Sequence, residues 1–461
     1  MINRLFLTFI SLLLVHNIAV AQESFTLEQA IDYALKNSSS LKMRSLDILE
    51  AEQSIKELKS RGMPTVSGTV GYQYFPIIPQ QPLEDFISPI VVGVLNNTVT
   101  QMNPIPLGDP TFFEVSFAQK HNIAASIDAR AVVFDGSYLA ALKAARLYKE
   151  FVNTGVAISE QEIRNNVTKA YMNVLILDKN KETIEKNIET LEKSLFETKE
   201  LYKEGFIEEL DVDRLELSLN NLMTERGKLL QVENLSKNLL KFQMDYPMDN
   251  SIMLEENLET IIGRSKIDDV DLEDEFDVSQ RPEYLQISKG IELQDIQLES
   301  VQKTNWPSVT AFANLGETLA RNELFDNDQP GWLPSSVLGL NVNVPIYDGG
   351  LRKSQIEKSK LATQKALIER DNFERAVELQ VSNARLQYIN AKSTLESTEK
   401  SLALAEKIFD KTQIKFREGV GSSVELTQAE AALYNEQSIY INALYDLLSA
   451  KIDLDIALGK I

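Results

Sequence analysis

The sequence predicts a mainly helical protein with a smaller β part, in which strands lead into long antiparallel helical hairpins. Three observations support this fold class. Apolar residues recur every seven residues over two long stretches near the carboxyl terminus, which is typical of long helices packed along a seam. Other segments alternate apolar and polar side chains with a period of two, as strands do. These features then occur twice along the chain, in the same order.

The longest helical pattern runs without a proline over 350–416. Its apolar column consists of Val381, Tyr388, Leu395, Leu402, Phe409 and Phe416. A turn containing Gly419 and Gly421 follows, and a second column that begins at Leu426 predicts a helix over 422–458. Because a helix rises 1.5 Å per residue, the first would be about 100 Å long, which no compact globular domain needs.

The first half of the chain carries the same landmarks. An Asp-Gly pair follows a predicted strand at Asp135 and again at Asp348, and a Glu-Gly pair marks a turn at Gly205 and again at Gly419. The two offsets are 213 and 214 residues, so the register is kept across a long helix. This self-similarity predicts a duplicated strand and long-helix-hairpin unit. The alternative, two unrelated hairpins, must explain why both share one order of features.

These landmarks divide the chain into four parts: a signal peptide at 1–21, a first repeat at 22–246, an acidic equatorial connection at 247–280 and a second repeat at 281–461. The first repeat is expected to contain helices within 26–61, strands at 65–75 and 111–134, and long helices at 137–203 and 208–245. The second is expected to contain a helix at 282–305, strands at 307–319 and 336–347, and long helices at 350–416 and 422–458.

Local signals place the ends of the early elements. Thr26 and Gln29 have the spacing of a capping box, so a helix begins there. Gly62 and the nearby Pro64 end the following helix. The stretch 76–110 is rich in proline and asparagine and predicts a long exposed loop, after which one continuous strand is expected to Phe134.

The amino terminus predicts export from the cytoplasm. Arg4 precedes a short apolar core at 5–15, and Ala19 and Ala21 form an A-x-A cleavage site. No cysteine follows this site, so we expect no bacterial lipoprotein anchor. With no other long apolar run, membrane insertion would have to use strands. Four strands cannot close a pore, so either several chains share a barrel or the strands lie outside lipid.

Composition argues against several classes of function. A formal net charge of −21 argues against binding to nucleic acid, which requires a basic face. The absence of cysteine excludes disulfides, thiolate chemistry and cysteine zinc sites. His121 is the single histidine after the predicted cleavage site, and its place on a predicted strand favours a structural role over catalysis or metal binding. We therefore infer no enzyme, no cofactor and no metal.

Several motifs resemble those of TolC-like outer-membrane efflux proteins. They are TLEQAIDYALKN at 26–37, PIYDGGLR at 345–352, the Glu418-Gly419 pair and VELTQAEAALYN at 424–435. Each motif alone is moderately specific, whereas their order and spacing together are a strong signal. The resemblance covers essentially all of the sequence after the signal peptide, including the duplication.

The resemblance implies a homotrimer in the outer membrane, in contact with its lipid. Each protomer would give four strands to a shared twelve-stranded β-barrel, continued by an α-helical barrel across the periplasm. The hairpin turns would form the entrance and dock on a periplasmic adaptor (membrane fusion) protein and an inner-membrane pump. The loops 76–110 and 321–334 would face outside the cell.

The resemblance also places candidate site residues. The residues expected at the periplasmic tip, for adaptor docking, are Gly205, Phe206, Gly419, Val420 and Gly421. Related proteins carry acidic rings just after the second turn, with a basic residue that ties the closed tip. Here Glu425 matches the first acidic position, but Gln428 occupies the second and Gly421 the basic one, which puts the usual salt-bridge lock in doubt. Asp211 and Asp213 follow the first turn and can supply acidic charge instead.

A local role competes with the ring at Glu425. Ser422 and Glu425 have capping-box spacing, and acids in a first helical turn suit the helix dipole. The function that the resemblance implies is passive conduction of substrates from the pump to the exterior. We expect the lumen to be acidic and therefore to favour cations. Two other classes remain open, a periplasmic adaptor and a structural coiled-coil protein of the envelope. The motifs do not say what is exported.

Overall fold

The computed structural model describes residues 23–98, 112–116, 118–264, 276–325 and 331–460. The predicted signal peptide and most of the acidic run 268–277 lie outside these residues. The chain forms two compact units. One comprises Met1–Glu52, Leu147–Gln294 and Leu361–Ile461, and the other comprises Gln53–Arg146 and Asp295–Lys360.

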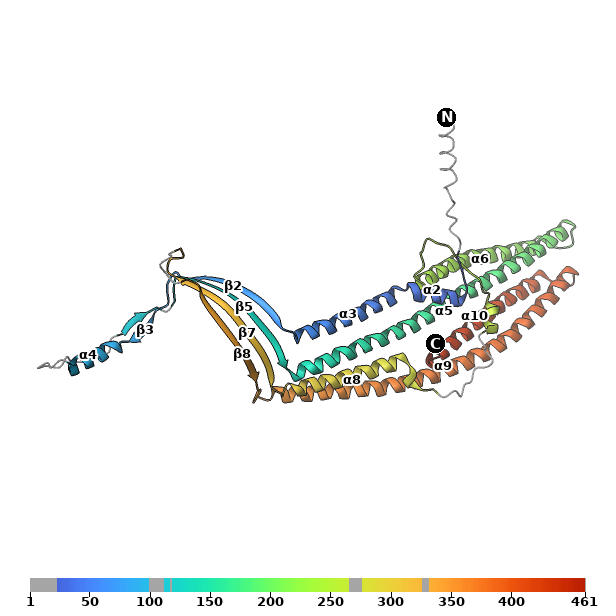
Figure 1. Ribbon diagram of the computed structural model, residues 1–461. Coiled ribbons are helices and arrows are strands. Elements are labelled where there is room, and N and C mark those ends of the chain that lie inside the picture. Colours follow the sequence, from blue (N-terminus) through green and yellow to red (C-terminus); the bar gives the residue numbers. More distant parts are fainter. Residues whose placement is uncertain (1–22, 99–111, 117, 265–275, 326–330, 461) are drawn as a thin grey trace, which may run out of the picture. The chain divides into compact units, whose positions relative to one another are not determined.

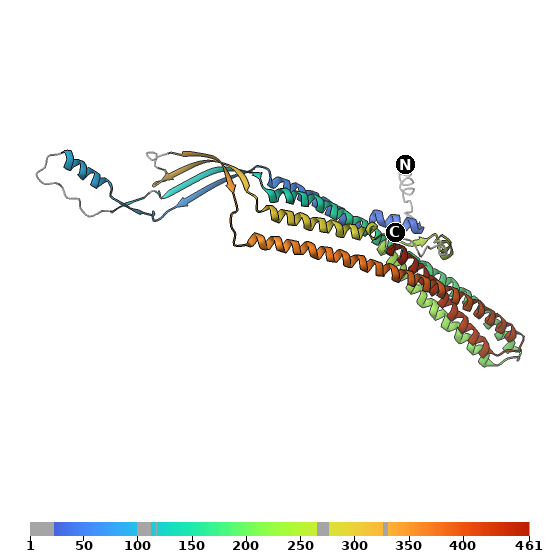
Figure 2. The same ribbon diagram turned by 90° about the horizontal axis from the view of Figure 1, so that it is seen from below.

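Two helical hairpins dominate the first unit. The long helix α5, Gly136–Lys203, is followed by α6, Glu209–Gln243, and the long helix α9, Leu351–Arg417, is followed by α10, Ser423–Ala457. Their lengths are 68 and 35 residues in the first hairpin, and 67 and 35 residues in the second. The two hairpins lie side by side, the first in teal to green and the second in orange to red in Figure 2.

The predicted apolar columns are the packing surfaces of these helices. Val381 and Tyr388 of α9 lie in one buried cluster with Leu447 and Leu454 of α10. A second cluster near the turns draws on all four helices. Its buried members are Leu191, Leu195, Val212, Leu215, Leu219, Ala405, Phe409, Leu426, Ala429 and Leu433. Seven-residue spacing therefore encodes contacts between helices, and burial of these side chains stabilises the hairpins.

Short elements pack against the middle of the hairpins. Strand β1, Glu23–Phe25, pairs in parallel with β6, Ile252–Leu254, and the Tyr171 hydroxyl of α5 donates a 2.9 Å hydrogen bond to the carbonyl of Phe25. Helix α2, Leu27–Asn37, begins at the Thr26 capping box, which forms as predicted. The remaining elements of this region are α7, Leu258–Arg264, and a 3₁₀ turn at Val278–Gln280.

Two further helices run along the long ones: α3, Ser39–Arg61, and α8, Pro282–Lys303. They lead into a four-stranded antiparallel sheet of β2, Thr65–Tyr74, β5, His121–Phe134, β7, Ser308–Arg321, and β8, Leu333–Asn343. The strand order is β2-β5-β7-β8, and Figure 1 shows these strands side by side. Within the described chain, β2 and β8 are open edges.

The sheet has one apolar face and one polar face. Residues that pair across antiparallel strands share a face, so Ile127 and Leu315 lie together, as do Asp128 and Asn314. The Asn314 amide donates a 2.8 Å hydrogen bond to Asp128. The apolar face is exposed in the single chain, most of all at Leu338, which is 86% accessible. Its other exposed apolar members include Val66, Val70, Tyr72, Leu340 and Val342.

The prediction of one continuous strand at 111–134 was wrong. The chain instead forms β4, Phe112–Val115, and β5 begins only at His121. β4 pairs with β3, Gln81–Glu84, which lies in the stretch predicted as a loop. The backbone hydrogen bonds between β2 and β5 extend to the one from the Phe75 amide to the Lys120 carbonyl. The residues before Lys120 therefore do not belong to this pair of strands and can pair with another segment.

The predicted loop 76–110 also contains a helix, α4, Ile87–Thr98. The Asp85 carboxylate accepts hydrogen bonds from the amides of Ile87 and Ser88, so it caps this helix. Pro89 lies in the first turn, where its missing N–H has no intrahelical partner to lose. The predicted end of β8 at 347 was likewise too late, because this strand ends at Asn343, before Pro345.

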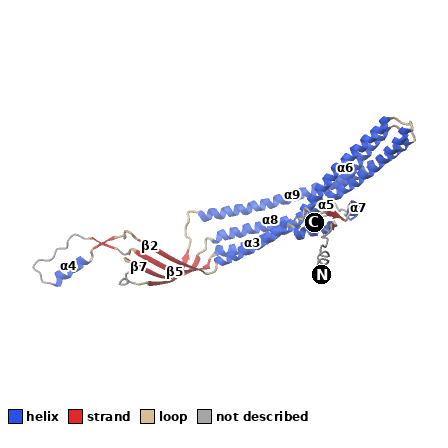
Figure 3. Ribbon diagram, turned by 90° about the horizontal axis from the view of Figure 1, so that it is seen from above, coloured by secondary structure: helices blue, strands red, loops and turns tan. Residues whose placement is uncertain are grey.

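Among the described residues, no helix is both long and apolar enough to cross a membrane. The two hairpin turns appear in Figure 3 as loops at the same end of the helix pairs. That end carries all the tip and ring residues expected from the sequence.

Candidate functional site

The two hairpin turns have the same backbone structure. In the first, the Phe206 amide donates to the Leu201 carbonyl and the Gly205 amide to the Tyr202 carbonyl, both at 2.9 Å. In the second, the Val420 and Gly419 amides donate to Lys415 and Phe416 in the same pattern, both at 3.0 Å. This is a Schellman motif, which requires a left-handed residue just after the helix.

The Glu-Gly pairs supply that residue. Gly205 has φ of 80° and Gly419 has φ of 74°, a region that favours glycine. The residue after each glycine is apolar and faces outward, with Phe206 75% and Val420 77% accessible. Each tip therefore presents one exposed apolar side chain on a rigid turn. Gly421 continues the second turn, and its amide also donates to the Lys415 carbonyl.

A polar junction joins the two hairpins directly behind the tips. Ser423, the first residue of α10, is 1% accessible, and its hydroxyl donates a short hydrogen bond to the Asp211 carboxylate of α6. The Arg214 guanidinium of α6 donates to the same hydroxyl at 2.9 Å and lies 3.8 Å from Asp211. Asp211 also accepts a hydrogen bond from the Glu208 amide, so it caps α6 as well.

The predicted ring residues occupy different environments. Asp211 is partly buried in the junction, whereas Asp213, Glu425 and Gln428 are exposed, and no ion pair is found for them in the described chain. Ser422 caps α10 by accepting from the Glu425 amide at 3.2 Å. The described residues do not show the reciprocal bond from the Glu425 carboxylate, so only half of the predicted capping box forms. The Glu425 carboxylate is left exposed to solvent.

Further polar contacts join the same helices. Arg417 of α9 lies 3.4 Å from Glu197 of α5, and Gln413 of α9 donates to Ser194 of α5 at 3.2 Å. Exposed ion pairs of this kind contribute little energy singly. These contacts help to fix the position of one hairpin against the other, because they join α5 of the first to α9 of the second.

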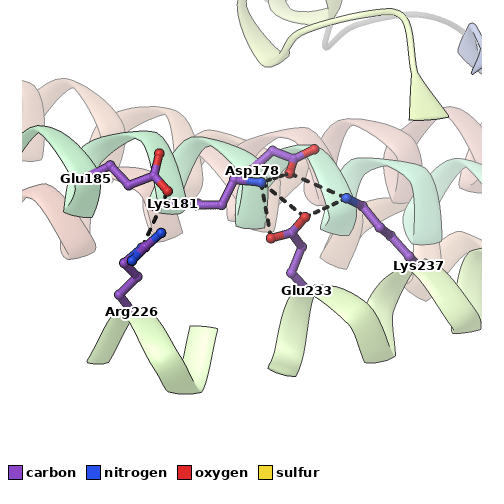
Figure 4. A network of polar contacts seen from close by, with 6 residues as sticks. All are labelled: Asp178, Lys181, Glu185, Arg226, Glu233 and Lys237. Carbon is purple, nitrogen blue, oxygen red and sulfur yellow. Dashed lines mark hydrogen bonds and ion pairs between the residues drawn. The ribbon is translucent and has the colours of Figure 1, made fainter. Parts of the chain in front are cut away.

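A buried network joins α5 to α6 farther along the first hairpin. Glu233 of α6 lies 3.1 Å from Lys181 of α5 and 2.5 Å from Lys237, and Asp178 completes the cluster (Figure 4). Burial alone would raise the pKa of Glu233, but hydrogen bonds from Lys237 and Lys181 outweigh it and lower the pKa. A separate pair, Glu185 with Arg226, lies at 3.5 Å along the same hairpin.

His121 lies at the start of β5, beside two tyrosines of β2. His121 Nδ1 lies 2.9 Å from the Tyr72 hydroxyl, and its ring packs beside Tyr74. Over the described residues, no group of three histidine, aspartate or glutamate side chains is placed to hold a metal ion.

Sequence reasoning missed the partners of Asp211 and one buried acid. Arg214 stands three residues after Asp211, a spacing that puts both on one helical face and could have been noticed. Glu430 lies between Leu426 and Leu433 on the apolar face of α10, and a charged residue on that face was a visible signal. Nothing in the sequence indicated that Ser423 would meet the first hairpin.

Comparison with known proteins finds a family match in the carboxyl-terminal part of the chain. Residues 279–460 match the family model described as "Outer membrane efflux protein". The outer membrane efflux protein BepC of Brucella suis biovar 1 (strain 1330) is 26% identical over 152 residues, which are 33% of this chain and 32% of that protein. Outer membrane protein TolC of Escherichia coli (strain K12) is 26% identical over 125 residues, 27% of this chain and 25% of that protein. The chain thus matches at most about a third of these relatives' length.

Likeness to solved structures extends over nearly the whole chain. The outer membrane protein VceC from Vibrio cholerae has a TM-score of 0.67 at 16% identity, with 94% of this chain and 96% of that chain covered. CusC, described for its transmembrane channel formation, has a TM-score of 0.71 at 12% identity, with 94% and 92% covered. At these identities the likeness shows a shared fold.

Proposed function

From the confirmed resemblance of this chain to TolC-like outer membrane efflux proteins, we propose that it is the outer-membrane exit channel of a tripartite efflux or secretion system. It conducts substrates passively, and an inner-membrane pump working through a periplasmic adaptor supplies the energy. The observation that carries this proposal is the open four-stranded sheet with one exposed apolar face, connected through Asp135 and Asp348 to two long hairpins.

Exposed edges and an exposed apolar face require a partner. The unpaired edges β2 and β8 favour addition of further strands, and exposed residues such as Leu338 and Leu340 favour contact with hydrocarbon. Three copies of the sheet would close a twelve-stranded barrel in which β8 of one protomer pairs with β2 of the next. The polar face, with Asp128 and Asn314, would then line the lumen.

The duplicated design is supported by matched helices and turns. The hairpins have nearly equal lengths, and both turns use the same Schellman motif around Gly205 and Gly419. Three protomers with two hairpins each would give a six-hairpin helical barrel in the periplasm, with the turns as its entrance.

The tips are the proposed docking surface for the adaptor. Phe206 and Val420 would provide six exposed apolar contacts per trimer, in two related sets. Asp213 and Glu425 are exposed near the same end, and threefold symmetry would place three copies of each around the entrance. Together with the net charge of −21, this ring predicts a preference for cations.

The proposal is tested on the purified full-length protein in a planar lipid bilayer. We expect discrete single-channel conductance and a heat-resistant trimer in the outer-membrane fraction, with reversal potentials in a salt gradient indicating cation preference. A stable, water-soluble monomer without conductance would refute the channel. An anion preference would refute only the charge argument. Recovery with inner-membrane or soluble periplasmic material would favour the adaptor or the structural protein.

A further inference from the structure

Glu430 is a buried carboxyl group that the proposed channel function does not use. It lies on α10 between Leu426 and Leu433, at 1% accessibility, in the surface that packs directly against α6. The Ser218 side chain of α6 favours the ionised form of Glu430, but by less than burial disfavours it. Its Oε2 atom has no hydrogen-bond partner among the described residues. An ionised carboxylate in this position would be poorly compensated.

Charged groups of α6 close in sequence to Ser218 are engaged elsewhere. On α6, Arg214 binds Ser423 and Glu216 pairs with Lys199 of α5. On the α9 side, Gln413 and the buried Phe409 carry no charge. Glu430 acts electrostatically on Tyr434, one turn further along α10. Among the described residues, Glu430 forms no ion pair.

These surroundings stabilise the neutral acid. Burial raises the pKa of Glu430 to about 7, because the Ser218 hydrogen bond lowers it by less. Burial also raises the pKa of Tyr434, and a negative charge on Glu430 would raise it further. The tyrosine therefore stays neutral over the range in which Glu430 titrates and cannot compensate it.

We propose that Glu430 makes the contact between α6 and α10 pH-sensitive, so that the two helices pack closely when the carboxyl is protonated and loosen when it ionises. Glu430 follows Ser423 by seven residues, about two helical turns, so the loosening would occur close to the junction between the hairpins. The inference concerns packing within this chain and does not depend on the proposed channel function.

The direction of the effect follows from proton linkage. The packed state binds the proton more tightly than the separated state, in which the group titrates near its ordinary value of 4.5. Packing is therefore favoured fully at low pH, weakens as the pH rises from about 4.5 to about 7, and then stays constant. With these values the local opening constant should rise on the order of tenfold to a hundredfold between pH 5 and pH 8.

The test is hydrogen–deuterium exchange of the full-length protein at pH 5 and pH 8, corrected for intrinsic exchange rates. The segments of interest are 211–222 of α6 and 423–434 of α10. In the wild type, we expect the local opening constant of these segments to be larger at pH 8 than at pH 5. In Glu430→Gln this difference should disappear, because glutamine keeps the shape and one hydrogen-bonding oxygen but cannot ionise. The matched control is Glu436→Gln, a less buried acid on the same helix, which should behave as the wild type.

Two results would overturn the proposal. One is a pH-dependent opening that persists unchanged in Glu430→Gln, because the titrating group would then lie elsewhere. The other is a wild-type opening constant that stays the same between pH 5 and pH 8. The second result needs no variant, so the proposal remains testable even if Glu430→Gln fails to assemble. Conductance in a bilayer tests the channel separately, and neither outcome decides the other.

Discussion

The junction behind the tips makes a sharp prediction for Ser423. This residue connects α10 to both Asp211 and Arg214 of the first hairpin, and it is buried. Replacement by alanine keeps the backbone and its helix, because Ser422, not Ser423, supplies the cap. Ser423→Ala should therefore loosen the contact between hairpins without unfolding either one.

The magnitude follows from the two hydrogen bonds. Both involve a charged partner, and such a bond contributes about 1.5–3 kcal/mol where it is shielded from water. Arg214 is partly exposed, so its share is discounted. A net loss of about 2 kcal/mol corresponds to roughly a thirtyfold increase in the ratio of separated to joined hairpins.

The assay combines exchange and conductance. Backbone exchange over 209–215 and 423–430 should rise in Ser423→Ala, and a bilayer recording should show a larger fraction of open time if the junction limits the entrance. A double-mutant cycle with Asp211→Asn should give a coupling energy of about 1–2 kcal/mol. Arg226→Ala is the matched control, because its ion pair with Glu185 joins helices of one hairpin only.

Additivity of Ser423→Ala and Asp211→Asn within about 0.3 kcal/mol would refute the reasoning, since it would mean that the two side chains do not interact. The same conclusion would follow if Arg226→Ala loosened the tips as much as Ser423→Ala.

Three further predictions rest on separate contacts. Glu233→Gln should destabilise the first hairpin by about 1–3 kcal/mol in thermal unfolding, because Lys181 and Lys237 lose a buried partner. Because the pKa of Glu233 is lowered in the folded protein, its ionised form stabilises the hairpin above about pH 4.5. This stabilisation is lost as the pH falls through the folded-state pKa, so the unfolding temperatures of wild type and variant should converge in acid. Tyr171→Phe should cost about 1 kcal/mol and increase exchange at β1, since the Phe25 carbonyl loses the Tyr171 hydroxyl and keeps the Glu255 amide as a donor; unchanged exchange there would contradict this. Gly419→Ala should cost about 1 kcal/mol of stability, because position 419 has a positive φ. It should reduce adaptor binding less than Val420→Asp, which removes the exposed apolar contact. Equal losses of binding would indicate that only the shape of the turn matters.

Much of the fold was predictable because its signals are local or periodic. A seven-residue column predicted the helix that ends at Arg417, the repeated landmarks predicted the one that ends at Lys203, and glycine after glutamate predicted both turns. The capping box at Thr26 was read correctly because it involves residues three apart. The prediction for the stretch 76–115 was wrong because its structure depends on contacts that are not local. The pairing of β3 with β4 joins distant residues, and the proline in the first turn of α4 is typical of a loop in composition.

The sequence by itself determined the periodicities and the order of the long helices and main strands, since both depend on residue identity and near neighbours. Only the tertiary structure decided which polar groups meet. The distance in sequence between Asp211 and Ser423, or between Ser218 and Glu430, is more than two hundred residues. Packing of the two hairpins brings these side chains together and removes water from them, and both the hydrogen bonds of Ser423 and the proton affinity of Glu430 depend on that burial.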